Sequence, residues 1–159
     1  MPTKPLRARA SHSHYARDGR SPTPKSESVS RTMSANRGSS TRPELALRRA
    51  LRRSGLAGFR VNVKGLPGRP DIAFPRARVV VFLHGCFWHR CPYCRPALPK
   101  NNADFWKAKF DRNRARDAAQ VAALRSAGWK VLVVWECQLR RAEGRAVARV
   151  AGALSRRGG

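Results

Sequence analysis

Acidic residues and long apolar segments are what this sequence has least of. Only 9 of its 159 residues are Asp or Glu, against 34 that are Lys or Arg, and the formal net charge is +25. An excess of this size favours polyanionic partners, because neutralising phosphates gives a basic protein substantial, salt-sensitive affinity for nucleic acid. A solvated basic surface, or packing against RNA as in ribosomal proteins, is the alternative explanation of the charge.

The absence of long apolar runs argues against membrane insertion and against secretion. No segment is long and apolar enough to cross a bilayer, and no apolar region follows the first residues as it does in a secretory signal. We therefore expect a cytoplasmic protein without membrane attachment. Outside an oxidising compartment the four cysteines are not expected to form a disulfide framework, so metal binding or redox chemistry explains them better.

Three of the cysteines lie close together in HGCFWHRCPYC, residues 84–94, and follow C-x4-C-x2-C spacing. A structural zinc ion takes four thiolate or imidazole ligands in tetrahedral geometry, often with a short C-x2-C pair among them. The spacing predicts a zinc site that joins this loop to the end of a later buried strand, with the ligands Cys86, Cys91, Cys94 and Cys137. His84 or His89 could replace one cysteine, and unliganded or redox-active thiols are the remaining alternative.

The apolar pattern predicts an α/β domain between two basic ends. Residues 1–29 are rich in Ser, Pro and Arg with almost no large apolar side chains, which predicts a disordered arm. Apolar spacing and turn signals then predict helices over 42–54, 101–127 and 141–157, and strands over 59–64, 69–74, 78–83 and 129–137. This order gives a small mixed sheet flanked by helices, with the domain at 30–141 and a helix and basic tail at 142–159.

Two polar residues interrupt the apolar face of the predicted helix 101–127. That face steps by three and four through Trp106, Phe110 and Leu124, and it also contains Asn113 and Asp117. Because buried polar groups need hydrogen-bond partners, we expect both side chains to face a site.

Three stretches together resemble the very short patch repair (Vsr) endonucleases: LPGRPDIAFPRARVVVFLHGCFWH, FWKAKFDRNRARD and GWKVLVVWEC. The resemblance covers about residues 31–141 and implies a restriction-endonuclease-like three-layer sandwich. It implies an enzyme that nicks DNA on the 5′ side of the thymine in a T·G mismatch, which arises when 5-methylcytosine deaminates. It also implies catalytic Mg²⁺, structural zinc, double-stranded DNA as partner and a bacterial cytoplasmic location; we expect a monomer, with mismatch-repair proteins as candidate partners.

The resemblance assigns catalytic roles to particular residues. Asp71 of GRPD matches the magnesium-binding aspartate, and His89 of HGCFWH matches the catalytic histidine. Glu44, His84 and Asp117 match supporting polar positions. The (D/E)xK pair of the wider superfamily is absent, so proton transfer falls to histidine, which exchanges protons near neutral pH.

Other positions are matched to metal or DNA contacts. Leu83 stands where a family member has threonine and where the backbone carbonyl binds magnesium, and Cys91 stands where histidine can occur. Phe87, Trp88 and Trp106 match aromatics that wedge into the base stack, Met33 matches a minor-groove residue, and Asn113 is assigned to the DNA-binding set. Packing in the core is the alternative for the aromatic residues.

Two other functions fit the same sequence. One is a zinc-stabilised DNA-binding protein without cleavage activity, which would have no need of the pair Asp71 and His89. The other is a nuclease of the same fold that acts on a different mismatch or on a branched substrate. The pair Asp71 and His89 favours a nuclease over a simple binding protein.

Overall fold

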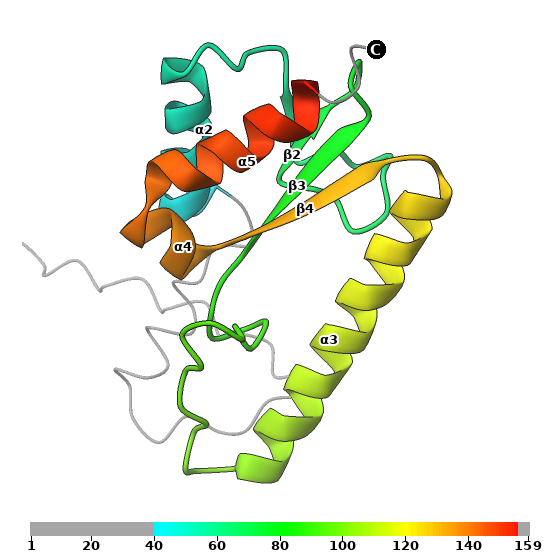
Figure 1. Ribbon diagram of the computed structural model, residues 1–159. Coiled ribbons are helices and arrows are strands. Elements are labelled where there is room, and N and C mark those ends of the chain that lie inside the picture. The colour runs from blue at the N-terminus through cyan, green and yellow to red at the C-terminus, as the bar shows by residue number, and fades with distance from the viewer. Residues whose placement is uncertain (1–39, 156–159) are drawn as a thin grey trace, which may run out of the picture. The chain divides into compact units, whose positions relative to one another are not determined.

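The computed structural model describes residues 40–155 of the chain (Figure 1). By contacts the chain divides into two units, residues 1–36 and 37–159, and the described residues belong to the second. The predicted arm 1–29 and Met33 lie outside the described residues, so the predictions made for them stay predictions. No helix within 40–155 is long and apolar enough to span a membrane.

A four-stranded mixed sheet forms the middle of the described unit. Its strands β1 (Arg60–Val61), β2 (Ile72–Phe74), β3 (Val79–His84) and β4 (Lys130–Trp135) lie in that order across the sheet. β1, β2 and β3 pair antiparallel, and β3 pairs parallel with β4 from Val79 opposite Lys130 to His84 opposite Trp135. The parallel pair needs a long crossover, which the helix α3 (Ala103–Ser126) supplies.

Helices cover both faces of the sheet and create two apolar cores. On one face, α2 (Arg42–Arg53) and α5 (Glu143–Ser155) pack against alternate residues of β2 and β3, including Val79 and Val81. On the other face, Leu124 of α3 packs against Val80 and Phe82 (Figure 1). β3 is therefore buried on both faces, which explains its uninterrupted apolar run. The α/β sandwich prediction is confirmed; membership of the restriction-endonuclease-like superfamily stays a prediction.

The C-terminal helix belongs to the core. Ala146, Val147, Val150 and Ala153 of α5 are buried in the same cluster as Leu47 and Leu51 of α2. α2 begins where expected, because Thr41 is its N-cap and accepts a hydrogen bond from the Glu44 N–H. The segment 142–159 was predicted to be a helix and a basic tail outside the domain 30–141, and its helix packs in the core of the sheet.

Two predicted strands end earlier than expected. The strand over 59–64 is reduced to Arg60–Val61, because Asn62 adopts a left-handed conformation (φ 50°) that interrupts extended backbone. The strand over 129–137 ends at Trp135 and is followed by the short helix α4 (Glu136–Arg141), whose Gln138 side chain accepts a hydrogen bond from the Trp135 N–H. Cys137 therefore lies in the first turn of a helix, and its placement at a strand end was wrong.

Candidate active site and metal centre

The candidate site residues gather at one end of the sheet. β3 ends at His84 and continues into the loop 85–102, while its parallel neighbour β4 ends at Trp135 and continues into α4. Asp71 immediately precedes β2, which runs antiparallel to β3, so Asp71 starts at the same end. Strand pairing thus brings together residues far apart in the sequence.

Asp71 carries a perturbed carboxylate beside β3. Its Oδ2 accepts a 2.7 Å hydrogen bond from the Leu83 N–H. The pKa of Asp71 is raised from 3.8 to about 6, chiefly by burial. The Leu83 hydrogen bond lowers this pKa, the charge of Glu44 raises it, and the charges of Arg48 and His89 lower it. A carboxylate that burial disfavours in this way gains from a cation, which makes Asp71 a suitable metal ligand.

His89 and Asp117 form a direct pair between the loop and α3. His89 Nδ1 lies 2.5 Å from Asp117 Oδ2, and the two side chains are 23% and 16% exposed. When Nδ1–H donates to the carboxylate, Nε2 is the nitrogen that can accept a proton. Asp117 therefore pairs with His89, and its Oδ1 also lies 4.0 Å from Arg116 Nη2; its role in a functional site stays a prediction.

His84 stacks on His89, with ring centroids 4.0 Å apart and ring planes 12° apart. His84 also contacts Trp135 in a T-shaped arrangement, with ring centroids 5.2 Å apart. Burial lowers the pKa of His84 to about 4, and the charge of His89 acts in the same direction while Asp117 opposes it. His84 is therefore neutral at neutral pH. Ligand-type atoms of His84, His89 and Asp117 all lie within 4.8 Å of one another.

Glu44 is buried and fully engaged at the start of α2. Its carboxylate accepts hydrogen bonds from the Ser40 N–H at 2.8 Å, the Thr41 hydroxyl at 2.9 Å and Arg48 Nη2 at 3.0 Å. Glu44 and Arg48 are 7% and 6% exposed. Sequence reasoning missed Arg48, although the spacing of four residues between opposite charges on one helix was the signal for it.

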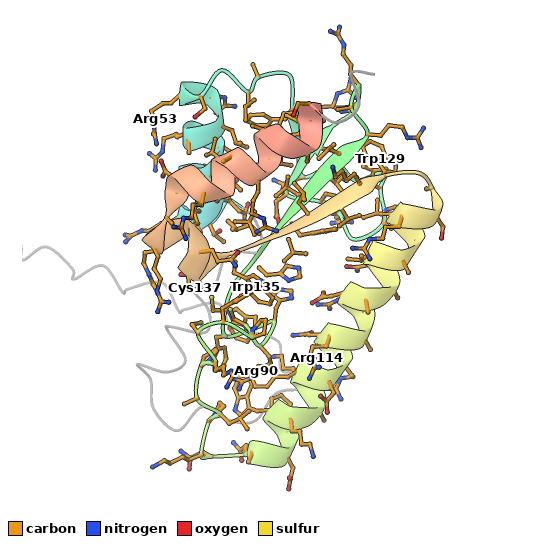
Figure 2. The ribbon with its side chains drawn as sticks, viewed as in Figure 1. Arg53, Arg90, Arg114, Trp129, Trp135 and Cys137 are labelled. Carbon is orange, nitrogen blue, oxygen red and sulfur yellow. The ribbon has the colours of Figure 1, made fainter. Side chains whose placement is uncertain are left out.

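The four cysteines come together where the loop meets α4. Their Sγ atoms all lie within 4.8 Å of one another, Cys91 and Cys137 Sγ are 3.6 Å apart, and the Cys137 N–H donates to Cys86 Sγ. Thiolates arranged tetrahedrally around zinc, each about 2.3 Å from the metal, lie about 3.8 Å apart. The four are free of disulfides. The spacing fits a metal ion of zinc's size, and Figure 2 shows Cys137 at the start of α4.

Thiol chemistry at this cluster also favours a cation. Burial raises the pKa of the Cys86 and Cys137 thiols, so these groups resist ionisation in the protein alone. At Cys91 burial acts the same way, but hydrogen bonds from the Cys94 and Tyr93 backbones lower the pKa. A bound divalent ion stabilises thiolates that burial otherwise disfavours. Because His84 and His89 belong to the other cluster, four cysteines are the better ligand set.

The aromatic side chains proposed as wedges form one cluster. The Phe87 ring lies 5.0, 5.6 and 5.3 Å from the rings of Trp88, Trp106 and Phe110. Phe110 is buried, whereas Phe87, Trp88 and Trp106 are partly exposed. Lys109 Nζ lies 5.3 Å from the Trp106 ring and 5.5 Å from that of Trp88. The rings thus have both a packed side and an accessible side.

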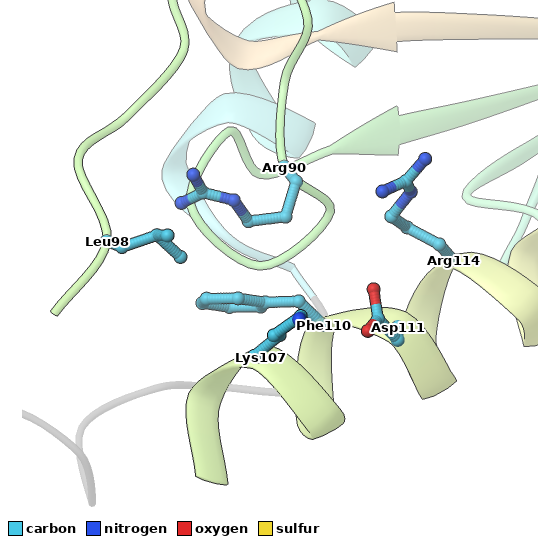
Figure 3. Close-up of a pocket in the computed structure, with 6 residues that line it drawn as sticks. All are labelled: Arg90, Leu98, Lys107, Phe110, Asp111 and Arg114. Carbon is cyan, nitrogen blue, oxygen red and sulfur yellow. The ribbon is translucent and has the colours of Figure 1, made fainter. Parts of the chain in front are cut away.

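A pocket of about 180 Å³ lies beside this cluster and is lined by Arg90, Leu98, Lys107, Phe110, Asp111 and Arg114 (Figure 3). The Arg90 guanidinium lies over the Phe110 ring, 5.0 Å from its centroid. Its Nη1 is buried and has no hydrogen-bond partner within residues 40–155. None of the lining residues is a catalytic candidate, although Arg90 directly follows His89 in the chain.

Similarity to known proteins agrees with this arrangement. The family model for the DNA mismatch endonuclease Vsr matches residues 23–95. The chain is 50% identical over 103 residues to the type II nicking enzyme V.XorIIP of Xanthomonas oryzae pv. oryzae, covering 65% of the chain and 75% of that protein. It is 41% identical over 140 residues to the type II nicking enzyme V.NaeI of Lentzea aerocolonigenes, covering 86% and 83%.

The DNA mismatch endonuclease Vsr of Escherichia coli is 45% identical over 89 residues, which is 56% of each chain. The range matched by the family model includes β3 and the first part of the loop that follows it, and so contains His84 and His89. The long match to V.NaeI takes in most of the described unit. The chain belongs to the Vsr family of DNA mismatch endonucleases.

Proposed function

We propose that the protein is a magnesium-dependent endonuclease that nicks one DNA strand on the 5′ side of the thymine in a T·G mismatch. This cut would initiate very short patch repair of deaminated 5-methylcytosine. Family membership and the names of the relatives, a mismatch endonuclease and several nicking enzymes, support the reaction class. The convergence of Asp71, His89 and Asp117 at one end of the sheet carries the proposal.

Asp71 and the backbone of Leu83 are the proposed holders of magnesium. In an extended strand, the N–H and C=O of one residue point to the same side. Because the Leu83 N–H reaches Asp71, the Leu83 carbonyl faces the same side as the carboxylate. Hard oxygen ligands suit Mg²⁺, which when bound neutralises charge that develops on the phosphoryl oxygens.

His89 is the proposed general base. Its Nε2 would take the proton of the attacking water, while Asp117 orients the ring and stabilises the imidazolium that forms. His84, neutral and stacked against the ring, would limit its movement without adding a second positive charge. Glu44 would be a supporting polar group of the site, and its carboxylate is fixed by hydrogen bonds from Ser40 and Thr41 at the start of α2.

The aromatic cluster is the proposed reader of the mismatch. Phe87, Trp88 and Trp106 would insert between base pairs from their accessible side, and unstacking costs least at a mismatched step. Met33 completes the proposed DNA-contacting set, whereas the Asn113 amide, expected in the same set, donates to the Trp88 carbonyl. Zinc at the four cysteines is proposed to hold the loop that carries Phe87, Trp88 and His89.

Strand cleavage decides between this function and its rivals. Wild type is incubated with T·G and matched duplexes of equal length, with and without Mg²⁺, and the position of the nick is mapped. We expect a nick beside the thymine only with Mg²⁺, and none with Asp71→Ala or His89→Ala. Tight binding without cleavage would favour a DNA-binding protein, and preferential cutting in a panel of other mismatches would reassign the specificity.

A further inference from the structure

Two side chains of α3 hold two consecutive residues of the loop. Asn113 Nδ2 donates a 3.2 Å hydrogen bond to the Trp88 carbonyl, and Asp117 Oδ2 lies 2.5 Å from His89 Nδ1. Residues four apart on a helix lie on one face, one turn from each other. The helix α3 therefore contacts both Trp88, which is proposed to read the mismatch, and His89, which is proposed to accept the proton.

Arg116 fixes the orientation of the Asn113 amide. Its Nη2 donates to Asn113 Oδ1 at 3.2 Å and lies 4.0 Å from Asp117 Oδ1. Arginine has donors only, so the amide oxygen faces Arg116 and the amide NH₂ is turned toward the Trp88 carbonyl. Arg116 thus contacts both Asn113 and Asp117, although its side chain is 59% exposed.

The held carbonyl belongs to the peptide that links Trp88 to His89. Fixing that peptide sets the last backbone torsion of Trp88 and the first of His89, and so the direction in which each ring leaves the chain. The N–H of the same peptide, that of His89, donates to the Gly85 carbonyl at 3.2 Å, so both polar groups of the peptide are held. Indole and imidazole are then mounted on one rigid unit.

We propose that Asn113 is a positioning residue that couples mismatch reading to catalysis through the Trp88–His89 peptide. Because the two residues share this peptide, insertion of the Trp88 indole into DNA would also place His89 Nε2 at the reacting water. The inference rests on the proposed function and changes the role expected for Asn113, whose amide acts on the loop backbone. Misplacement of a catalytic group by about 1 Å can cost on the order of a hundredfold in rate.

The test separates cleavage rate from DNA affinity in full-length protein. Asn113→Ala and Asn113→Gln are compared with wild type by single-turnover cleavage at saturating enzyme and by fluorescence anisotropy on a labelled T·G duplex without Mg²⁺. We expect Asn113→Ala to lower the saturated rate about tenfold to a hundredfold with less than about a threefold change in Kd. Asn113→Gln keeps an amide donor and should recover part of the rate.

Arg116→Ala should lower the saturated rate in the same direction by a smaller factor. Arg125→Ala removes the same charge from the end of the same helix and is the matched control, expected to leave the rate unchanged. Circular dichroism and the melting temperature show whether each variant folds. If Asn113→Ala does not fold, Asn113→Gln is compared with wild type instead.

Two results would overturn the coupling alone. The first is a raised Kd for the T·G duplex with an unchanged saturated rate, which would make Asn113 a direct DNA contact. The second is equal loss with Asn113→Ala and Asn113→Gln at unchanged melting temperature. If the wild-type protein cleaves no T·G duplex, the proposed function is wrong, and the coupling fails with it. If wild type cleaves and only the Asn113 variants give one of the two results above, the coupling alone is wrong.

Discussion

Replacing Asp71 by Asn is expected to abolish cleavage and also to stabilise the fold. The pKa of Asp71 is raised from 3.8 to about 6, chiefly by burial. At about 1.4 kcal/mol per pKa unit, the ionised carboxylate destabilises the magnesium-free fold by up to about 3 kcal/mol at neutral pH. Asn removes that charge and keeps an oxygen that can accept the Leu83 N–H hydrogen bond.

The pH dependence follows from the sign of the shift. A carboxyl whose pKa is higher in the folded protein contributes most favourably below its unfolded pKa, and that contribution is lost as pH rises through the folded value of about 6. The advantage of Asp71→Asn should therefore be nearly complete at pH 7 and fall to about 1 kcal/mol near pH 4.5.

Urea unfolding without added Mg²⁺ or chelator measures both quantities, with wild type and Asp71→Asn compared at the two pH values. Added Mg²⁺ should stabilise wild type and leave the variant unchanged, because ligand binding to the native state shifts the unfolding equilibrium. If Asp71→Asn is less stable than wild type at pH 7, or if its advantage does not shrink toward pH 4.5, the electrostatic account of this carboxylate is wrong.

Three further changes test other parts of the molecule. Removing zinc with a chelator should lower the melting temperature and release about one metal ion per chain, measured by atomic absorption; an unchanged melting temperature after metal loss would contradict a structural role. Trp88→Ala should weaken discrimination between T·G and matched duplexes more than overall affinity in anisotropy titrations, and equal losses on both duplexes would count against the wedge. Gly68→Ala should cost about 1–3 kcal/mol in urea unfolding, because Gly68 has φ +74° and its Cβ would lie 2.6 Å from Gln120 Oε1, whereas Gly65→Ala meets no atom within 4 Å and should be close to neutral.

Periodicity and spacing predicted much of this molecule. The run 78–83 predicted the central strand, because a strand buried on both faces must be apolar throughout. C-x2-C spacing, together with the expectation of a non-secreted protein, predicted that the four cysteines would meet. Asn113 and Asp117 were expected to face a site because they are polar positions in an apolar stripe, and both contact the loop.

Other features depend on partners that a single segment does not specify. Helical spacing identified Asp117 but not His89, because the partner is set by the path of an irregular loop. The short helix α4 followed an apolar strand without a turn signal, so Cys137 was placed at the end of a strand. Catalytic roles came from the resemblance to a family, since His89 alone is equally consistent with a zinc ligand.

The register of β3 and β4 determines both candidate sites at once. His84 and Trp135 are paired at the ends of the two strands, and Cys86 and Cys137 each follow two residues later. A slip of one residue would displace one strand by about 3.3 Å and turn its side chains to the opposite face. It would separate Cys137 from Cys86 and remove the 5.2 Å contact between His84 and Trp135. A metal ion held by the four cysteines would therefore stabilise the same register that positions the histidines.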